Sequence, residues 1–214
     1  MKQNIIGLIF FISLGVAAQT SKPFTPTKGE IVFREVSKIT DQKLLDESLK
    51  TSKEKLKKSL KMSLLKEEGD KEKEKEIEQM AEESANMMKQ IFVEDSSQIH
   101  EYHFDKMPGN SENVILKISE NRKDKKNING YECFKVVYQY TENKENTDED
   151  YLIYAGDIQY QREMWVTDKI KASYHPVVFE KSILEKYYPL YILETQSDIK
   201  GFERKFILEK INLQ

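Results

Sequence analysis

Residues 129–140 read Asn-Gly-Tyr-Glu-Cys-Phe-Lys-Val-Val-Tyr-Gln-Tyr. Asn-Gly favours a tight hairpin turn, because both residues tolerate positive φ. The following stretch, Tyr131–Tyr140, has the β-branched and aromatic content of a strand. Side chains alternate along a strand, so one face carries the apolar and aromatic set that we interpret as the core face: Phe134, Val136, Tyr138 and Tyr140. Cys133 is then expected on the opposite face, beneath a covering element.

Similar short segments recur on both sides of this strand. They are Gly29–Lys38, Gln98–Phe104, Asn113–Ser119, Tyr151–Tyr154, Gln159–Thr167, Tyr188–Thr195 and Phe202–Leu213. Short strands at close spacing favour an antiparallel meander over βαβ units. We therefore predict an α+β fold with a curved antiparallel sheet, which could form an incomplete barrel. A short helix or irregular turn is expected within Pro176–Lys186, and a polar loop over Thr141–Asp150.

Asp41–Phe92 differs in kind, since about half of its residues are charged and it contains no proline. One helical stripe recurs at spacings of four and seven: Leu45, Leu49, Leu56, Leu60 and Leu64. Thr40 is the expected N-cap, with Asp41 beside it. Gly69 would end this helix, and Asp70 would cap a second one.

The second helix is expected to carry its own apolar stripe: Ile77, Met80, Ala81, Met87, Met88 and Ile91. The pattern predicts a helical hairpin inserted at about residues 41–92. Two interpretations stay open. The hairpin is either a solvated pair of helices with one stripe packed on the sheet, or a lid or partner-binding surface, because methionine side chains adapt to varied shapes. The second interpretation makes Met80, Met87 and Met88 candidate binding residues.

The N-terminus has the features of a cleavable export signal. Lys2 precedes an uncharged apolar run, Ile5–Val16, and small residues lie before a cut after Ala18. The run is too short to span a bilayer, which needs about 20 residues. We therefore expect residues 1–18 to be a signal peptide, 19–28 a flexible leader and 29–214 one β-rich domain with no transmembrane segment. The mature protein is expected to be periplasmic or secreted.

Composition and charge argue against several function classes. The chain has 34 basic and 37 acidic residues and a formal net charge of −3. It has no one-sided basic field, so nucleic-acid binding is not expected. Cys133 is the single cysteine, which excludes an intramolecular disulfide and a metal site of several thiolates; we expect it to be a buried small hydrophobe. The sequence has neither a glycine-rich phosphate loop nor a Gly-x-Ser-x-Gly nucleophile motif, and we expect no cofactor.

The remaining chemical motifs are incomplete. His100 and His103 resemble the His-Glu-x-x-His zinc motif with one residue missing, and on a strand they would face opposite ways. Residues 148–150 are acidic but lack a calcium-binding loop pattern. The sequence does not exclude a Cys133–His175 catalytic dyad, because it does not show how close the two residues lie in the fold. No local motif supports such a dyad. We therefore expect His100 and His103 to be surface histidines and expect no metal site.

Residues 126–135 have the form Lys-x-Ile-x-Gly-Tyr-x-Cys-x-Lys, and Trp-Val-Thr follows at 165–167. This ordered pair resembles the GLPGLI family of exported bacterial proteins and a neighbouring family without assigned function. The Gly-Leu-Pro-Gly-Leu-Ile turn itself is absent, and residues 188–194 keep its Pro-Leu core. The resemblance covers roughly residues 113–213 and implies a β-rich envelope protein. It implies no catalytic residue.

Three functions stay open. The first is a non-enzymatic envelope protein that binds another protein, such as an outer-membrane protein. The second is a carrier of an apolar ligand or lipid in a half-barrel, and the third is a hydrolase that uses carboxylates or a hidden dyad. Trp165, Tyr188 and Tyr191 are either core anchors or part of a ligand or partner surface, because each has an apolar ring with a polar tip.

Overall fold

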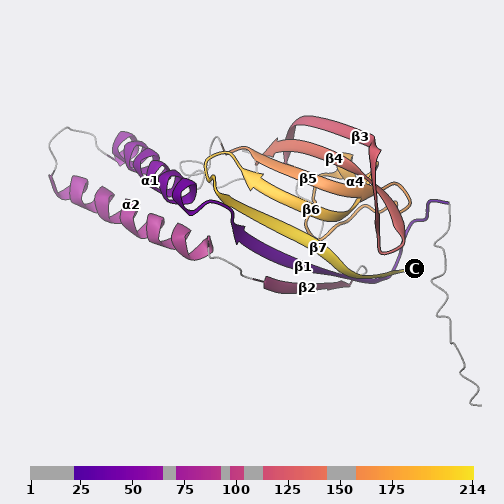
Figure 1. Cartoon of the computed structure of the whole chain (residues 1–214). Coiled ribbons are helices and arrows are strands. Elements are labelled where there is room, and N and C mark those ends of the chain that lie inside the picture. The colour runs from indigo at the N-terminus through magenta and orange to yellow at the C-terminus, as the bar shows by residue number, and fades with distance from the viewer. Residues whose placement is uncertain (1–21, 65–70, 93–96, 104–112, 144–157) are drawn as a thin grey trace, which may run out of the picture.

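The computed structural model describes residues 22–64, 71–92, 97–103, 113–143 and 158–214. Seven antiparallel strands form one sheet in the order β2-β1-β7-β6-β5-β4-β3 (Figure 1). The strands are β1 (Gly29–Ile39), β2 (Ser97–His103), β3 (Val114–Ile128), β4 (Tyr131–Thr141), β5 (Tyr160–Thr167), β6 (Tyr188–Gln196) and β7 (Phe202–Leu213). Two long helices, α1 (Gln42–Leu64) and α2 (Lys71–Ile91), connect β1 to β2. The predicted α+β fold with a curved antiparallel sheet and an inserted helical hairpin is confirmed.

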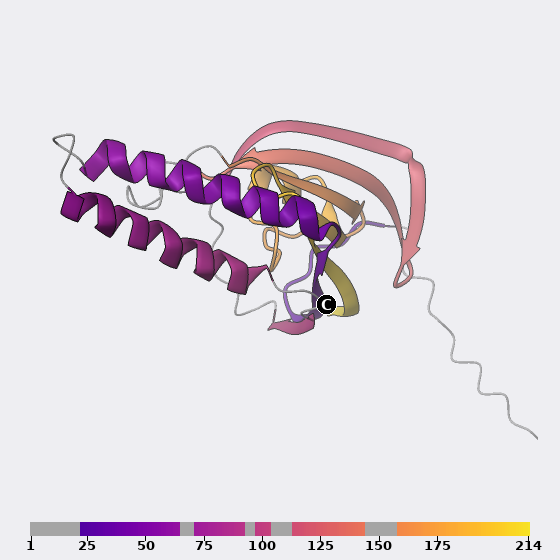
Figure 2. The ribbon, with the colours of Figure 1, turned by 60° about the vertical axis from the view of Figure 1, so that its left-hand side comes forward.

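The sheet curves around the chain that connects β5 to β6 (Figure 2). This connection includes the short helix α4 (Lys181–Leu184), inside the range predicted for a short helix. Its apolar side chains, such as Ile170, Val178 and Leu184, are fully buried in one cluster with strand residues. The interior of the curve is therefore a packed core made of strand and connection side chains.

Strand β4 contributes the predicted core face, since Phe134, Val136, Tyr138 and Tyr140 are all buried. The preceding turn has positive φ at Asn129 and Gly130, as its sequence predicts. Cys133 is buried as expected, but its predicted place on the opposite face is wrong. It belongs to the same cluster as Phe134. The alternation of buried and exposed residues along β4 is interrupted here, because Cys133 and Phe134 are consecutive and both are buried. The interruption lies opposite the extra residues that β3 carries between Asn121 and Lys125.

The helical hairpin projects beyond the end of the sheet (Figures 1 and 2). Four of the five leucines in the predicted stripe divide into two clusters, whereas the prediction is wrong for Leu64, which is 42% exposed. At the base, Leu45 and Leu49 pack on Ile199 and Phe202 at the turn between β6 and β7. Farther out, a cluster formed by the two helices alone contains Leu56, Leu60, Ile77 and the partly buried Met80. The outer half of the hairpin is thus stabilised by helix–helix contact.

Small side chains and ion pairs join the two helices. Ala81 and Ala85 are buried on α2, which allows a close approach to α1. Lys53 forms an ion pair with Glu82, and Lys57 forms one with Glu78. Solvent reaches these lysines and screens both ion pairs, so their contribution to stability is small.

The expected start of α1 needs a correction. The backbone N–H of Leu44 donates to Asp41 Oδ1 at 3.0 Å, so Asp41 is the N-cap. The N–H of Thr40, the predicted cap, donates to the carbonyl oxygen of Gly201 at 2.8 Å. This hydrogen bond holds Thr40 against the β6–β7 turn, one residue before the N-cap of α1.

The expected flexible leader also needs a correction in its described part, residues 22–28. Phe24 exchanges two backbone hydrogen bonds with Lys169 and Lys171, each of 2.9 Å, and its ring packs on the core cluster. Pro26 is buried. These contacts hold the segment on the folded domain, and Phe24 is the side chain that reaches the core cluster.

Strand β3 is longer than its predicted range of Asn113–Ser119, because it continues to Ile128. None of the described helices combines the length and apolar character that a bilayer span requires. Several predictions lie outside the described residues. They are the signal peptide, the helix boundary at Gly69 and Asp70, the strand Tyr151–Tyr154, the acidic residues 148–150 and most of the loop Thr141–Asp150.

Replacing Gly201 with alanine tests the attachment of the hairpin. Gly201 has φ +76°, and a Cβ there would collide with the carbonyl oxygen of Asp41. We expect Gly201→Ala to lower the free energy of unfolding by about 2 kcal/mol or more, through both the strained φ and the collision. Urea unfolding measures the change.

Gly130→Ala is the matched control, since Gly130 also has positive φ but lies in an exposed turn. It should cost about 1 kcal/mol from φ alone. Equal costs for the two variants would contradict the tight contact between Gly201 and the start of α1.

Candidate functional site

A ladder of charged and phenolic side chains crosses the concave face of the sheet. Arg162 on β5 lies at its centre. The Nε of Arg162 donates to Glu194 Oε2 at 2.6 Å, and its Nη1 donates to Tyr138 Oη at 2.8 Å and to Glu180 Oε2 at 3.4 Å. One guanidinium therefore joins β4, β5, β6 and the connection between β5 and β6.

The ladder continues toward β2. The second oxygen of Glu194 lies 3.9 Å from Arg204 Nη1 on β7. The Nε of Arg204 lies 3.3 Å from Glu35 Oε1 on β1, and Glu35 Oε2 lies 2.8 Å from His100 Nε2 on β2. Opposite charges thus alternate across the four neighbouring strands β5, β6, β7 and β1, and the His100 ring on β2 follows.

Phenols and an amide complete the hydrogen bonding of the two carboxylates around Arg162. The Tyr138 hydroxyl donates to Glu180 Oε2 at 3.0 Å, and the Tyr140 hydroxyl donates to Glu194 Oε2 at 3.0 Å. The Nδ2 of Asn113, which directly precedes β3, donates to Glu180 Oε1 at 2.7 Å. The ladder thereby reaches the start of β3.

Strand register explains why these residues meet. Arg162 pairs directly with Glu194 and with Tyr138, and Glu194 pairs with Arg204. Residues directly opposite in antiparallel strands have their Cβ atoms about 5 Å apart. All four side chains lie on the same face of the sheet as buried neighbours such as Met164, so they point inward.

Burial makes these pairings obligatory. The side chains of Arg162 and Glu180 are only 7% and 1% exposed. A buried charge is costly unless it is paired and hydrogen-bonded. Burial raises the pKa values of Tyr138 and Tyr140, which keeps both phenols protonated as donors. Burial alone would lower the pKa of Arg162, but Tyr138, Glu194 and Glu180 raise it above its ordinary value.

The chemistry of the ladder fits structural support better than catalysis. Glu180 and Glu194 both accept hydrogen bonds from an arginine and a tyrosine. A general base needs an oxygen that can approach a substrate proton. These carboxylates are instead held by cations inside the protein, so they are not available in that way.

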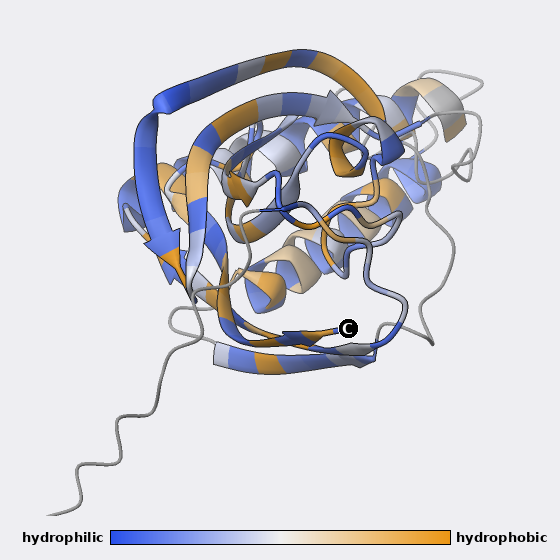
Figure 3. Cartoon of the chain, turned by 90° about the vertical axis from the view of Figure 1, so that its right-hand side faces the viewer, coloured by the Kyte–Doolittle hydropathy of each residue, from blue (hydrophilic) through white to orange (hydrophobic). Residues whose placement is uncertain are grey.

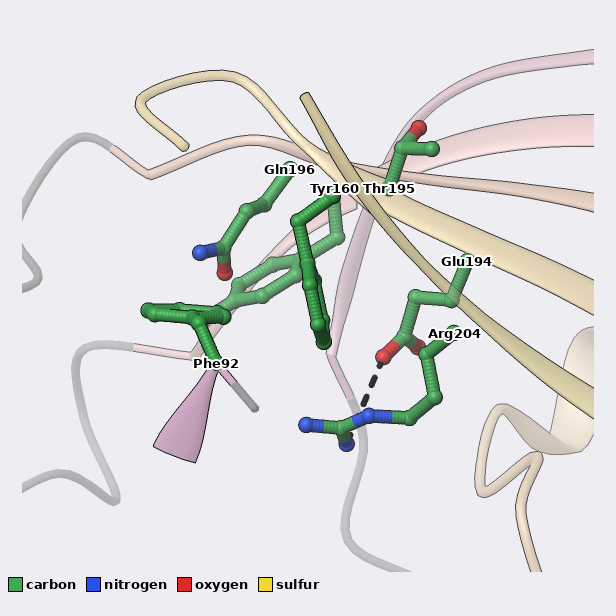
Figure 4. A pocket seen from close by; sticks show the side chains of 7 residues that line it. Phe92, Tyr160, Glu194, Thr195, Gln196 and Arg204 are labelled. Carbon is green, nitrogen blue, oxygen red and sulfur yellow. Dashed lines mark ion pairs between the residues drawn. The ribbon is translucent and has the colours of Figure 1, made fainter. Parts of the chain in front are cut away.

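A small cleft lies where the ladder reaches the hairpin (Figure 4). Its lining combines aromatic rings with polar and charged side chains: Phe92, Tyr160, Glu194, Thr195, Gln196, Phe202 and Arg204. The rings of Phe92 and Phe202 meet edge to face with centroids 4.8 Å apart, which closes the cleft on the hairpin side. Its volume of about 20 Å³ is close to that of a single water site, far below the several hundred Å³ of a ligand pocket.

The three candidate methionines of α2 lie in different environments. Met80 packs in the outer helix–helix cluster, and Met88 packs at the base with Leu45 and Leu49. Met87 is 62% exposed. Ile91, also expected in the buried stripe, is 59% exposed. The predicted stripe is wrong at these last two positions, because Ala85 supplies the helix contact instead.

The candidate aromatic residues are also separated. Trp165 and Tyr191 are direct cross-strand partners on the convex face, and Lys126 Nζ lies 5.8 Å and 5.6 Å from their ring centroids. Trp165 also packs against the core cluster. Tyr188 is fully buried on the concave side. The structure therefore brings together Trp165 and Tyr191 but not the other candidates.

The histidines and Cys133 have separate partners. His175 is fully buried; its Nε2 lies 3.0 Å from the Pro189 carbonyl oxygen, and its Nδ1 accepts from the N–H groups of Val177 and Val178. Cys133 Sγ lies 3.6 Å from the carbonyl oxygen of Tyr131, and burial raises its pKa to about 12. His100 faces Glu35, whereas His103 lies near Glu101. Among the described residues, no group of three or more His, Cys, Asp or Glu could hold a metal ion.

A comparison with known protein families, curated protein sequences and solved structures finds no match to this chain. The resemblance to the GLPGLI family therefore stays a prediction, carried by residues 126–135 and 165–167.

Sequence reasoning missed the ladder. The sequence nonetheless contained a sign of it. Arg162 lies two residues before Met164, and Glu194 lies two residues after Ile192, so each charged residue is on the same strand face as a buried apolar one. A charged residue in an otherwise apolar phase requires a buried partner. Which carboxylates would meet Arg162 depended on strand register, which the sequence did not reveal.

Removing the central guanidinium should be strongly destabilising. We expect Arg162→Met to lower the free energy of unfolding by about 3–5 kcal/mol, because Glu180 and Glu194 lose their buried counterion. Lys135→Met is the matched control, since it breaks a partly exposed ion pair with Glu163 on the convex face, worth at most about 1 kcal/mol. Chemical unfolding of both variants is the measurement; similar small losses would show that the ladder is not a structural support.

His175 should make stability depend on pH. Burial lowers its pKa from 6.5 to about 3, so between these values the unfolded chain binds a proton that the folded chain does not. The free energy of unfolding therefore falls as pH falls below 6.5, by about 1.4 kcal/mol at pH 5.5 from this residue.

His175→Asn keeps an acceptor near the position of Nδ1 and removes the titration. We expect the variant to be less stable at pH 7.5 but to lose about 1.4 kcal/mol less than the unmodified protein between pH 7.5 and 5.5. An unaltered pH dependence in His175→Asn would contradict the buried neutral histidine.

Proposed function

We propose that this is an exported envelope protein without enzymatic activity, which binds another protein through its helical hairpin. The observation that carries the proposal is an exposed apolar pair on α2, Met87 and Ile91, which are 62% and 59% exposed. The two residues are four apart, so they lie on one helical face. We call them the α2 apolar pair.

The rest of α2 shows that the exposed α2 apolar pair is not part of the contact between the two helices. The helix is otherwise strongly charged, and its contact with α1 uses a neighbouring stripe, roughly 100° around the helix, formed by Ile77, Ala81 and Ala85. The pair therefore contributes little to hairpin folding. Exposed apolar side chains on a charged helix are typical of helices that bind an apolar groove of a partner.

The mounting of the hairpin suits such a role. Its base is fixed by the cluster of Leu45, Leu49 and Phe202 and by a hydrogen bond of 3.0 Å from the Lys200 N–H to Ser48 Oγ. Met88 and Phe92, which are next to Met87 and Ile91 in sequence, pack in the same basal cluster. The sheet thus holds the α2 apolar pair at a defined position at the base of the hairpin, while the outer helical turns extend away (Figure 2). A rigid mount lowers the entropy that is lost when a partner binds.

The two alternative functions have less support. A carrier needs an apolar cavity of several hundred Å³, whereas apolar side chains of the β5–β6 connection occupy the interior of the curve. A hydrolase needs accessible acid and base groups, whereas Glu180 is buried, Glu194 is only 13% exposed, and both are paired with Arg162. The export signal and the resemblance to the GLPGLI family support the envelope location.

Photo-crosslinking in envelopes of the host tests the proposal. A photoreactive residue at exposed Glu83, one turn before Met87, would be introduced in the otherwise unmodified chain and in Met87→Asp/Ile91→Asp. We expect a discrete polypeptide adduct in the former and an adduct about tenfold weaker in the latter, because charges in an apolar contact cost well over 1 kcal/mol.

Gln79→Asp/Lys89→Asp, at two exposed polar positions on the same helix, is the matched control and should leave the adduct unchanged. Melting temperatures of all variants should agree within a few degrees, since every altered side chain is exposed. An adduct that persists undiminished in Met87→Asp/Ile91→Asp would refute binding through the α2 apolar pair.

A further inference from the structure

We propose that the start of β3, residues Val114–Ile118, accepts an extended strand from another protein, with apolar side chains alternating with acidic ones. β3 is the last strand of the sheet, and the described residues place no strand along its outer side. Among the described residues, none pairs with the backbone groups on that side. This surface is separate from the hairpin and does not depend on the function proposed above.

The two halves of β3 differ sharply. Val114, Leu116 and Ile118 are 46%, 48% and 42% exposed, and no charge occurs before Lys117. From Glu120 onward the strand is almost continuously charged, and its pairing with β4 is interrupted between Asn121 and Lys125. Figure 3 shows the hydrophobic start and hydrophilic remainder of this outermost strand. Charges and irregular pairing protect edges from association, so the first half lacks the protection of the second.

The opposite edge of the sheet provides a comparison within the same molecule. β2 has seven residues against fifteen in β3. Its outward side chains are polar apart from Ile99, and it carries Glu101 and two histidines. Short length and charge are common protections of an edge strand. The start of β3 is therefore the exception between the two edges.

Register defines the side chains that an added strand would meet. Ile118 pairs with inward-facing Tyr138, and Lys117 pairs with Gln139 on the outer face. Leu116 is the extra residue at a register shift between Ile115 and Lys117. An added strand would cover Leu116 and Ile118 with side chains on its inner face, while those on its outer face would lie beside Lys117.

Charge favours a partner strand over a second copy of this chain. β3 carries five basic and two acidic side chains, so two β3 strands aligned along their length would bring like charges together, which is unfavourable. A strand with acidic residues on its outer face would instead complement Lys117 and the basic residues that follow. Because its neighbour β4 runs antiparallel to β3 and antiparallel pairing is slightly the more stable, we expect antiparallel addition.

A designed peptide tests this on the whole mature chain. The probe is acetyl-Thr-Glu-Val-Glu-Val-Glu-Val-Thr-amide, and the readout is amide hydrogen exchange together with fluorescence anisotropy of a labelled copy. We expect the peptide to slow exchange of amides within Val114–Ile118 and not within β2. Leu116→Lys/Ile118→Lys should weaken binding about tenfold, since it replaces the apolar contacts and adds charge at the edge. Both side chains are partly exposed, so an unchanged melting temperature will confirm that the variant folds.

Ile99→Lys on β2 is the matched control, because Ile99 is an exposed apolar residue on the other edge; it should not change binding. A peptide with lysine in place of glutamate should bind about tenfold more weakly. No protection of β3 at millimolar peptide, or protection of β2 instead, would overturn the proposal. A concentration-dependent dimer that Leu116→Lys/Ile118→Lys abolishes would also overturn it, since the occupant would then be a second copy.

Discussion

The buried guanidinium of Arg162 is the constraint on which the rest of the concave face depends. It must have counterions, and the two it has come from different parts of the chain: Glu194 from β6 and Glu180 from the β5–β6 connection. Satisfying one charge therefore fixes both the register of β5 on β6 and the position of the connection inside the curve. The apolar cluster supplies most of the driving force for burial, whereas the charges favour this arrangement over others that would leave Arg162 unpaired.

The same constraint explains how the molecule divides its surfaces. The β5–β6 connection covers the apolar part of the concave face. The charged part borders the narrow cleft beside Phe92 and Arg204 and continues to β1 and β2. At this cleft, the ladder residues Glu194 and Arg204 lie beside Phe92, where the hairpin joins the sheet. What remains for contact with other molecules lies outside the curve, on the projecting hairpin and at the free edge of β3. This distribution favours a binding scaffold over a container or a catalyst.

The sequence predicted those strands and helices that have apolar side chains on a buried face and polar side chains on an exposed face. β4 and β7 have strong strand composition and were placed within a residue of their ends, and four of the five leucines in the predicted stripe of α1 marked its buried face. The second half of β3 was missed because its side chains are almost all exposed and backbone pairing with β4 holds it. Met87 and Ile91 were assigned to the buried stripe because apolar character suggested burial, yet buried Ala81 and Ala85 make the helix contact. The place of Cys133 depended on the interrupted pairing of β3, which no local pattern reveals.

The most direct test of the scaffold account is native mass spectrometry of the mature chain, Gln19–Gln214, after mild cross-linking in host envelopes and gentle extraction. The account predicts excess mass that corresponds to a defined polypeptide bound to one copy of the chain. A lipid-sized adduct that is lost on denaturation would contradict it and support the carrier. The mass of the chain alone, recovered from cross-linked envelopes, would also contradict a protein whose function is to bind a partner.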